Sequence, residues 1–484
     1  MQNLVKTLLK KGILINPEEI SLDQIDSIIT QDNPPLVLDK NSMYVKETDT
    51  KEYDKNKTAS QKPPAPNSSK VEIITTYEEF NIKKTLKDFV DLYNHRYQLL
   101  QSILRQRQDM SRVTSIIKLK SIDERETVSV IAIVLDIRIS KNNNVLLKLE
   151  DPTGIIKAII TKNNKEAFEL AKEITPDEVI GVSGTKGNNV IFVNNILNPD
   201  VPIGKELKKS PIDEAAVFIG DLHFGSKAFL KDAFERFMSW ILQKSKDTSL
   251  SKKVKYLFIM GDLVEGIGIF PGQEKDLETL DIYEQYNLFT ENILRIPEDI
   301  NIIICPGNHD SIRIAEPQPP IPKEMFPGLQ NRKNLYLVSS PSNIRIGANE
   351  EFHGIDILLY HGFSFPYYAN AIESLRLAGG LEATDKIMAY LLKKRHLAPT
   401  HGSTQYQLGF KEDPLVIKTV PDIFVSGHIH RATIANYRNT TLINSSCWVS
   451  QTDYQEQRGL MPDPCKAVYI DLKTRDVKML DFEK

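Results

Sequence analysis

Residues 301–310 read NIIICPGNHD, and this stretch indicates the fold of the C-terminal part of the chain. Its consecutive apolar side chains are typical of a short buried strand, and the Pro–Gly pair that follows ends that strand. Asn308, His309 and Asp310 then place an amide, an imidazole and a carboxylate directly after it. The stretch therefore predicts a buried strand whose carboxyl end carries side chains of the types that bind metal ions.

Four other apolar runs after residue 212 repeat this arrangement, and two of the gaps between runs hold the helix-like segments FLKDAFERFMSWILQK and LETLDIYEQYNLFTENIL. The runs are AVFIG before Asp221 and His223, YLFIMG before Asp262, DILLY before His361 and Gly362, and DIFVSG before His428 and His430. In open α/β sheets, sites form at the carboxyl ends of the strands. The sequence therefore predicts an α/β region in which five strand ends converge on one site.

This mixture of side chains suits a pair of divalent cations. Phosphodiester hydrolysis develops negative charge on the attacking and leaving oxygens, and two cations about 3.5–4 Å apart stabilise both. Asp262 is the natural bridging carboxylate, imidazoles fill other positions, and Asn308 adds a neutral oxygen. Mixed nitrogen and oxygen ligands suit Mn, Fe or Zn better than Mg alone, and Mn²⁺ is the first candidate, with Fe, Zn and Mg as alternatives. His309 is left to protonate the leaving oxygen or to bind the phosphate, with Asp310 as its orienting partner.

Each motif also has an ordinary structural interpretation. A lone Asp-x-His or Gly-Asp is more often a turn or a helix cap than a ligand pair, and GNHD or GHIH can hold a loop histidine without metal. However, five of the nine histidines follow predicted strands in order, which favours a site. The remaining four are interpreted as ordinary polar or surface residues, and two of them, His396 and His401, call for inspection in the structure; the other two are His95 and His353.

The chain as a whole predicts a multidomain α+β protein. Residues 1–31 have the leucine spacing of a small helical domain, and residues 32–70 are too polar and too rich in charge and proline to fold, which predicts a disordered linker. Residues 71–112 are predicted to be helical. Residues 113–205 hold about five short β-branched runs and one helix, the pattern of an OB-type barrel. Residues 206–484 form the α/β region that carries the predicted site.

Composition narrows the class of protein. The formal net charge of -3 gives no overall basic signal for nucleic acid, but local patches rather than the total govern such binding. The three cysteines form no CxxC pair, so reduced thiols are favoured over a zinc ribbon or a disulfide framework. The N-terminus lacks the layout of a signal peptide, and no apolar run is long enough to span a bilayer. We therefore expect a cytoplasmic protein that does not associate with a membrane.

The ordered set D-x-H, G-D, G-N-H-D, H-G and G-H-x-H resembles the calcineurin-like metallophosphoesterase superfamily over residues 212–484. This resemblance implies a β-sandwich flanked by helices, with His309 as the proton donor or phosphate contact. It also implies two ligand sets that share one carboxylate: Asp221, His223, Asp262 and His430 for one metal, and Asp262, Asn308, His361 and His428 for the other.

Three longer stretches resemble a narrower family, the small subunits of archaeal family D DNA polymerase. They are GNHDSIRIAEPQPPIP (307–322), KRHLAPTHG (394–402) and INSSCWVSQTDYQEQRGLMP (443–462). The family implies a heterodimer with a large catalytic polymerase subunit and a proofreading 3′–5′ exonuclease that acts on single-stranded DNA or primer 3′ ends. A sliding clamp is a further candidate partner, although Gln2-x-x-Val5-x-x-Leu8-Leu9 has only the spacing of a clamp motif and fits an amphipathic helix better.

Two other functions stay open at this point. The chain could be a non-catalytic scaffold of the polymerase, although buried carboxylates and imidazoles without metal would be costly. It could also be a stand-alone repair metallonuclease. An OB-type domain favours nucleic acid, but residues 113–205 lack a dense aromatic set for base stacking, so a protein-interaction module is an equal alternative for that domain.

Overall fold

The computed structural model describes residues 70–80, 83–110, 112–452, 455–456 and 459–483, together with the backbone of residues 14–15 and 37–38. The chain divides into two compact units, 1–67 and 68–484, each considered by itself. In the first unit, β1 (Leu14–Ile15) pairs in parallel with β2 (Val37–Leu38). The rest of the expected helical domain, nearly all of the expected linker, and the clamp-like spacing at Gln2 lie outside the described residues.

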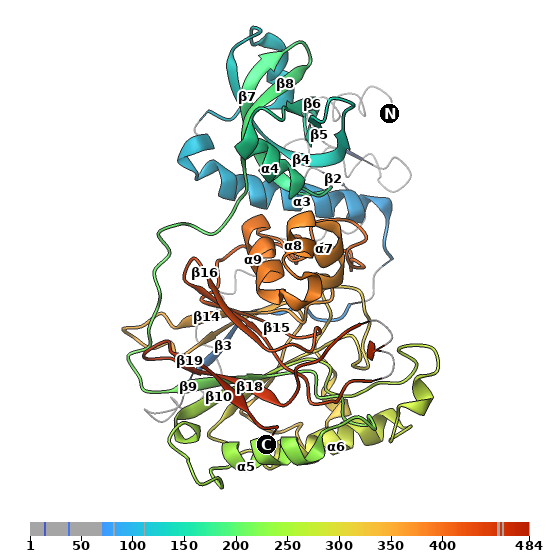
Figure 1. The fold of residues 1–484 in the computed structure, drawn as a ribbon, viewed down its shortest axis with the longest axis vertical. Coiled ribbons are helices and arrows are strands. Elements are labelled where there is room, and N and C mark those ends of the chain that lie inside the picture. The colour runs from blue at the N-terminus through green and yellow to red at the C-terminus, as the bar shows by residue number, and fades with distance from the viewer. Residues whose placement is uncertain are drawn as a thin grey trace, which may run out of the picture. The chain divides into compact units, whose positions relative to one another are not determined.

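Five strands of the second unit form a closed barrel in the order β4-β5-β6-β8-β7 (Figure 1). They are β4 (Thr127–Ile139), β5 (Val145–Asp151), β6 (Gly154–Ile160), β7 (Val179–Gly187) and β8 (Val190–Leu197), with helix α4 (Lys165–Lys172) between β6 and β7. Alternate side chains such as Val130, Ala132 and Val134 point inward and form a core of their own. The expected strands and helix of the barrel are therefore confirmed.

The segment before the barrel, residues 71–112, was expected to be helical but has a strand at its N-terminal end. Helix α3 (Leu86–Arg105) is present, and it buries Leu92 and Leu100 on one face. However, β3 (Val71–Thr75) lies within the stretch expected to be helical and pairs with the distant β13 (Ser342–Ile346). The run VEIIT has the β-branched composition of a strand. Sequence alone did not separate it from the helix because its pairing partner lies far along the chain.

The remaining strands form two six-stranded sheets. The first has the order β12-β11-β10-β9-β18-β19, and the second has the order β16-β17-β15-β14-β13-β3. The strands of the first sheet are β9 (Ala215–Ile219), β10 (Val254–Met260), β11 (Asn301–Cys305), β12 (Leu335–Leu337), β18 (Lys466–Asp471) and β19 (Val477–Asp481). Besides β3 and β13, the second sheet contains β14 (Ile355–Leu359), β15 (Ile423–Ser426), β16 (Thr433–Tyr437) and β17 (Thr440–Asn444).

The two sheets pack face to face. Phe218 and Phe258 of the first sheet share a core with Ile357 and Val425 of the second. On the outer faces lie α5 (Lys231–Ile241) and α6 (Ile282–Leu294) for the first sheet, and α7 (Phe365–Ala371), α8 (Glu373–Leu377) and α9 (Thr384–Lys394) for the second. The central strands are buried on both faces, which explains their unbroken apolar runs.

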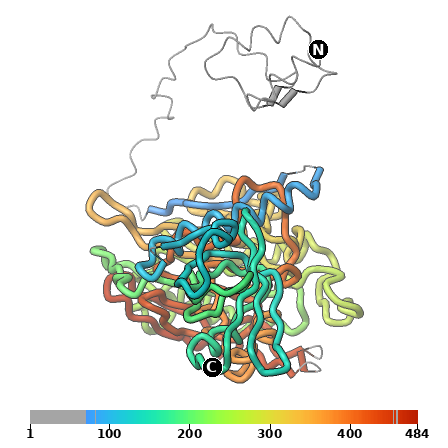
Figure 2. Tube along the Cα trace, turned by 90° about the horizontal axis from the view of Figure 1, so that it is seen from above, coloured from blue at the N-terminus to red at the C-terminus, as the bar shows by residue number. Residues whose placement is uncertain are grey.

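Figure 2 looks down on the barrel and shows its strands in front of the two sheets. No helix among the described residues combines the length and apolar character needed to cross a bilayer. The expected helices at FLKDAFERFMSWILQK and LETLDIYEQYNLFTENIL are confirmed as α5 and α6. The architecture is thus a barrel with its preceding helix, followed by two sheets that present the ends of parallel strands from both layers.

Candidate metal centre

The five strand ends singled out by the sequence meet in one place. Three belong to the first sheet and two to the second: β9 leads to Asp221 and His223, β10 to Asp262, β11 to Asn308 and His309, β14 to His361, and β15 to His428 and His430. The strands β9, β10 and β11 are mutually parallel, and so are β14 and β15, so their carboxyl ends share one edge of each sheet. Asp221 and His361 are 0% exposed and Asp262 only 1%, so the carboxylates and imidazoles that meet there are almost fully removed from water.

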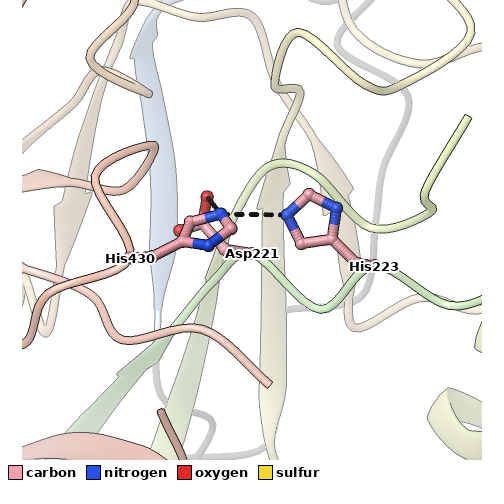
Figure 3. Close-up of side chains that lie close together, drawn as sticks. All are labelled: Asp221, His223 and His430. Atoms are coloured by element: carbon pink, nitrogen blue, oxygen red, sulfur yellow. Dashed lines mark hydrogen bonds and ion pairs between the residues drawn. The ribbon is translucent and has the colours of Figure 1, made fainter. Parts of the chain in front are cut away.

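The first group consists of Asp221, His223 and His430 (Figure 3). Nε2 of His430 lies 3.0 Å from Nε2 of His223 and 3.5 Å from Oδ1 of Asp221. Two imidazole nitrogens and a carboxylate oxygen thus face a common point. This is a donor set that divalent transition metals take.

The second group consists of Asp262, His361 and His428. Nε2 of His361 lies 3.3 Å from Oδ2 of Asp262 and 3.2 Å from Oδ1 of Asn308. Nδ1 of His361 is 2.7 Å from the carbonyl oxygen of Met260, which fixes the ring so that Nε2 points at the carboxylate. The rings of His361 and His428 have centroids 5.2 Å apart.

The carboxylate of Asp262 lies between the two groups. Its Oδ2 is 3.3 Å from His361 of the second group and 3.9 Å from Nε2 of His223 of the first. Donor atoms of Asp262, His223 and His309 also lie within 4.8 Å of one another. The Asp262 carboxylate therefore lies between the two groups of donor atoms, a position that suits a carboxylate shared by two cations.

The backbone around these residues is strained. Several ligand-type residues adopt a left-handed conformation: Asp221 (φ 51°), His223 (φ 52°), Asp262 (φ 49°), His428 (φ 71°) and His430 (φ 60°). Non-glycine residues rarely take positive φ, and each such residue costs on the order of 1–3 kcal/mol. Such strain persists where the surrounding structure enforces it, and it gathers at functional sites. Here it turns each side chain inward immediately after its strand.

Two glycines allow the loops to approach the carboxylates closely. A Cβ atom on Gly307 would lie 2.2 Å from Oδ1 of Asp262, and one on Gly427 would lie 2.6 Å from Oδ2 of Asp221. Real Cβ atoms do not come this near to a neighbouring atom, so a larger residue at either position would displace a ligand-type carboxylate. The glycines of the GNHD and GHIH motifs are therefore required by packing around the site.

Two imidazoles of the centre hold protons strongly in the absence of a cation. Burial disfavours the charged ring of His223, but the charges of Glu265, Asp262 and Asp221 raise its pKa to about 9. Burial likewise disfavours the charged ring of His361, but Asp262 and Asp221 raise its pKa to about 10. The carboxylates thus create a field that stabilises positive charge at both rings.

The other carboxylates and imidazoles of the centre also have shifted pKa values. Burial, aided by the charge of Asp262, raises the pKa of Asp221 to about 7. Burial acts in the same direction on Asp262, but the nearby imidazoles, His361 above all, hold the pKa of that carboxylate well below its usual range. Burial and the charge of His361 lower the pKa of His428 to about 3, and burial lowers that of His430 well below its usual range. Both rings are therefore neutral and suited to bind a metal.

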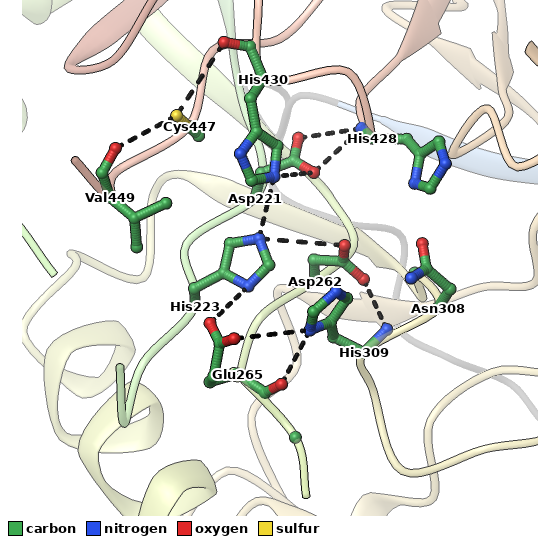
Figure 4. A network of polar contacts seen from close by, with 12 residues as sticks. Asp221, His223, Asp262, Glu265, Asn308, His309, His428, His430, Cys447 and Val449 are labelled. Carbon is green, nitrogen blue, oxygen red and sulfur yellow. Dashed lines mark hydrogen bonds and ion pairs between the residues drawn. The ribbon is translucent and has the colours of Figure 1, made fainter. Parts of the chain in front are cut away.

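His309 is held by a residue that sequence reasoning missed, Glu265 (Figure 4). Nδ1 of His309 lies 2.8 Å from the carbonyl oxygen of Glu265, and the Glu265 carboxylate lies 3.0 Å from Nδ1 of His223. Gln273 donates a hydrogen bond of 3.0 Å to the same carbonyl. One residue therefore holds two histidines. Its signal in the sequence is its place three residues after Asp262 in the same loop.

Asp310 has a different role from the one expected. Its carboxylate accepts hydrogen bonds from the backbone N–H of Gly307 at 2.8 Å, from that of Leu263 at 3.1 Å, and from the Tyr286 hydroxyl at 3.3 Å. These contacts tie the GNHD loop to the loop after β10. The prediction that Asp310 orients the His309 ring is thus wrong, because Nδ1 of that ring donates to the carbonyl oxygen of Glu265.

Comparison with known proteins identifies the family. Residues 216–435 match the model for the B subunit of DNA polymerase alpha/epsilon, and residues 128–189 match the model for an OB-fold nucleic acid binding domain. The DNA polymerase II small subunit of Methanothermobacter thermautotrophicus is 38% identical over 82% of this chain and 79% of that protein. This chain belongs to the archaeal family of DNA polymerase II small subunits.

Other members of this small-subunit family match over similar or greater lengths. The protein of Thermoplasma acidophilum is 33% identical over 99% of this chain and 93% of its own length. That of Archaeoglobus fulgidus is 38% identical over 78% of this chain and 74% of its own length. The resemblance drawn from the three long motifs is thereby confirmed, and so is the OB-fold domain. The match to the alpha/epsilon family model spans all the ligand-type residues from Asp221 to His430.

Three further histidines and the cysteines of this small subunit lie outside the two groups of ligand-type side chains. His396 is 0% exposed, and its Nε2 lies 3.0 Å from Oδ2 of Asp413, so of the two interpretations it is an ordinary polar residue in the interior and not a surface residue. His401 is exposed, as is His353. The three cysteines are buried and unpaired.

Proposed function

We propose that this small subunit is a metal-dependent 3′–5′ exonuclease that acts within a heterodimer with a large catalytic polymerase subunit. The observation that carries the proposal is the position of the Asp262 carboxylate between two groups of ligand-type side chains, with His309 beside them. We also propose that the two packed sheets have the calcineurin-like fold of metallophosphoesterases. The substrate we propose is single-stranded DNA or the 3′ end of a primer.

The residues fit two divalent cations. Asp221, His223 and His430 would hold one, while the second would be held by Asn308, His361 and His428, and Asp262 would be shared. The fit rests on the chemistry of the donors: ring nitrogens 3.0 Å apart face a buried carboxylate, and two of the imidazoles are neutral. Mn²⁺ is our first candidate, with Fe, Zn and Mg as alternatives. Such cations neutralise phosphate charge and lower the pKa of an attacking water.

His309 is the group that we assign to the leaving oxygen or to the phosphate. Its Nδ1–H donates to the Glu265 carbonyl, so the doubly protonated ring would give its Nε2 proton to the departing oxygen and become the neutral Nδ1–H form. Its side chain is 16% exposed, whereas that of His223 is 3% exposed, so of these two rings His309 is the more accessible to a substrate. The Asp310 carboxylate accepts backbone hydrogen bonds that hold this loop, and we propose Asp310 as a positioning residue.

A nuclease assay tests this proposal. The substrates are 5′-labelled oligonucleotides, single-stranded or annealed with a matched or mismatched 3′ end, with Mn²⁺ and the purified heterodimer. We expect stepwise shortening from the 3′ end by the wild type, and shortening about 10²- to 10⁴-fold slower by His309→Ala. His353→Ala, which changes an exposed histidine outside the centre, is the matched control and should behave as the wild type.

The alternatives predict other results. A scaffold subunit would give no shortening by the wild type, even with metal bound. A stand-alone repair nuclease would shorten DNA but would purify from its native source without a large polymerase subunit. A sliding clamp stays a further candidate partner, and its binding to the full chain can be measured separately.

A further inference from the structure

The motif KRHLAPTHG, residues 394–402, takes no part in the metal centre. It begins at the last residue of helix α9, and its polar groups face the OB-fold barrel instead. Nζ of Lys394 lies 2.7 Å from Oε2 of Glu178, at the start of β7, and the two side chains are 2% and 1% exposed. The hydroxyl of Thr400 donates to that of Thr175 at 2.7 Å. The motif therefore forms a buried polar contact with the barrel.

Helix α3 strengthens the same contact from its own side. Nε of Arg96 lies 2.7 Å from Oδ2 of Asp413, with side chains 0% and 1% exposed. The same carboxylate meets Nε2 of His396 at 3.0 Å, so a residue of the motif shares the partner of the α3 arginine. Arg96 also donates to the carbonyl oxygen of Pro399 within the motif.

The other end of this segment reaches the wall of the metal centre. The backbone N–H of Glu316 donates to the carbonyl of Gln405 at 2.8 Å, and that of Gln407 donates to the carbonyl of Glu316 at 2.7 Å. The Tyr360 hydroxyl then donates to the Glu316 carboxylate at 3.0 Å. Tyr360 immediately precedes His361, a ligand-type residue. Residues 394–407 thus contact the barrel at one end and the support of the centre at the other.

A contact made of buried ion pairs is an unusual way to join two parts of a protein. Well-packed apolar side chains of similar volume often give equal or greater stability, because desolvation offsets most of the attraction between buried charges. Paired charges add a requirement for geometry, since each group must meet its own partner. The pairs at Lys394 and Arg96 therefore select one arrangement of the barrel relative to the sheets.

We propose that residues 394–407 are a rigid joint that fixes the OB-fold barrel relative to the metal centre, so that a polynucleotide bound along the barrel delivers its end to that centre. In this joint Lys394 and Glu178 are positioning residues. They increase the rate of cleavage of polynucleotides but not that of small phosphodiesters. This inference rests on the proposed phosphodiesterase function.

The test compares two substrates. Lys394→Met alone leaves the buried Glu178 carboxylate with hydrogen bonds from Thr175 and Tyr390 but without a cationic partner, so the informative variant is Lys394→Met with Glu178→Gln. We expect it to cleave an oligonucleotide about 10- to 100-fold more slowly, because misplacement of about 1 Å has effects of that size, and to hydrolyse bis(p-nitrophenyl) phosphate at the wild-type rate. The matched control is Lys393→Met with Glu173→Gln. That pair also joins α9 to the barrel, at 2.7 Å, but its side chains are 24% and 28% exposed. Solvent screens this partly exposed pair more than the buried one, so the control should stay within about twofold of the wild type.

A distance measurement separates this inference from the proposed function. Spin labels at Asn194→Cys on the barrel and Lys244→Cys after α5 occupy exposed positions, and the natural cysteines are buried. We expect one narrow distance distribution in the wild type and the control, and a broad one in the variant that lacks the buried pair. If the distributions are equally narrow, or if both substrates slow equally, the joint proposal is overturned. If the wild type cleaves neither substrate, the proposed function fails, and the distance distributions still decide whether the joint is rigid.

Discussion

The candidate metal centre and the joint at residues 394–407 are both buried polar clusters, but their charged groups are arranged differently. In the joint, Lys394 pairs with Glu178 and Arg96 pairs with Asp413, while Arg395 donates to backbone carbonyls such as that of Ile417. In the centre, imidazole nitrogens of His223 and His430 lie 3.0 Å apart, and carboxylates crowd the same space. Each ion pair of the joint joins one lysine or arginine to one carboxylate, whereas the candidate centre gathers several imidazoles around the carboxylates of Asp221 and Asp262.

Backbone conformation gives the same contrast. Five ligand-type residues of the centre have positive φ, while in the motif at 394–402 the only non-glycine residue of this kind is Arg395, at the end of α9. Strain of this kind is maintained where it positions reactive groups. The two clusters therefore differ less in buried charge than in backbone conformation, and the gathering of imidazoles and carboxylates on left-handed backbone is what supports the proposed metal site.

Loss of the shared carboxylate should have the largest effect. Asp262→Asn removes the charge that both groups of donors face, and stabilisation of transition-state charge by metal is worth several kcal/mol. We expect nuclease activity to fall to background in the Mn²⁺ assay. The joint should be unaffected, so the distance distribution between labels on the barrel and after α5 should not change. Retained activity would show that Asp262 is not shared by two cations.

His309→Ala should lower the rate by about 10²- to 10⁴-fold, the usual contribution of a general acid or base. Because His309 is not assigned as a ligand, metal binding should be preserved. Single-turnover cleavage rates and Mn²⁺ titration of the same preparation measure the two properties. Loss of metal together with activity would make His309 a ligand instead.

Metal affinity should rise with pH. His223 and His361 have raised pKa values, about 9 and about 10, so both rings are protonated at neutral pH without metal. A cation must displace those protons, and raising the pH removes the competition by about tenfold for each proton and each pH unit until those pKa values are reached. Calorimetric titration of Mn²⁺ in buffers of different ionisation enthalpy measures the protons released. An affinity that is flat or falls between pH 6 and 9 would contradict the charge balance described here.

Glu265→Gln should have a smaller effect. The amide keeps the size of the side chain but weakens its hold on His223, and loss of such a supporting contact costs about 10- to 100-fold in metal affinity or activity. The matched control is Glu274→Gln, one residue from Gln273 in the same loop and exposed. Equal behaviour of the two variants would remove Glu265 from the site.

The features that depend on local sequence pattern could be predicted from the sequence. Apolar runs followed by Asp, His or Asn located the strand ends, and the barrel strands followed from short β-branched runs. It missed β3, because its partner β13 lies far along the chain, and it missed Glu265, whose contacts with His223 and His309 appear only when two loops meet. Asp310 was misassigned for the same reason: adjacency in sequence to His309 suggested a contact that the fold gives to Glu265. His396 could not be recognised as buried before Arg96 and Asp413 were brought beside it.

Anomalous diffraction from crystals of the chain soaked in Mn²⁺ tests the central claim most directly. Two peaks are predicted on either side of the Asp262 carboxylate, one contacted by Asp221, His223 and His430, and the other by Asn308, His361 and His428. A single peak, or peaks only outside these residues, would contradict the two-metal centre.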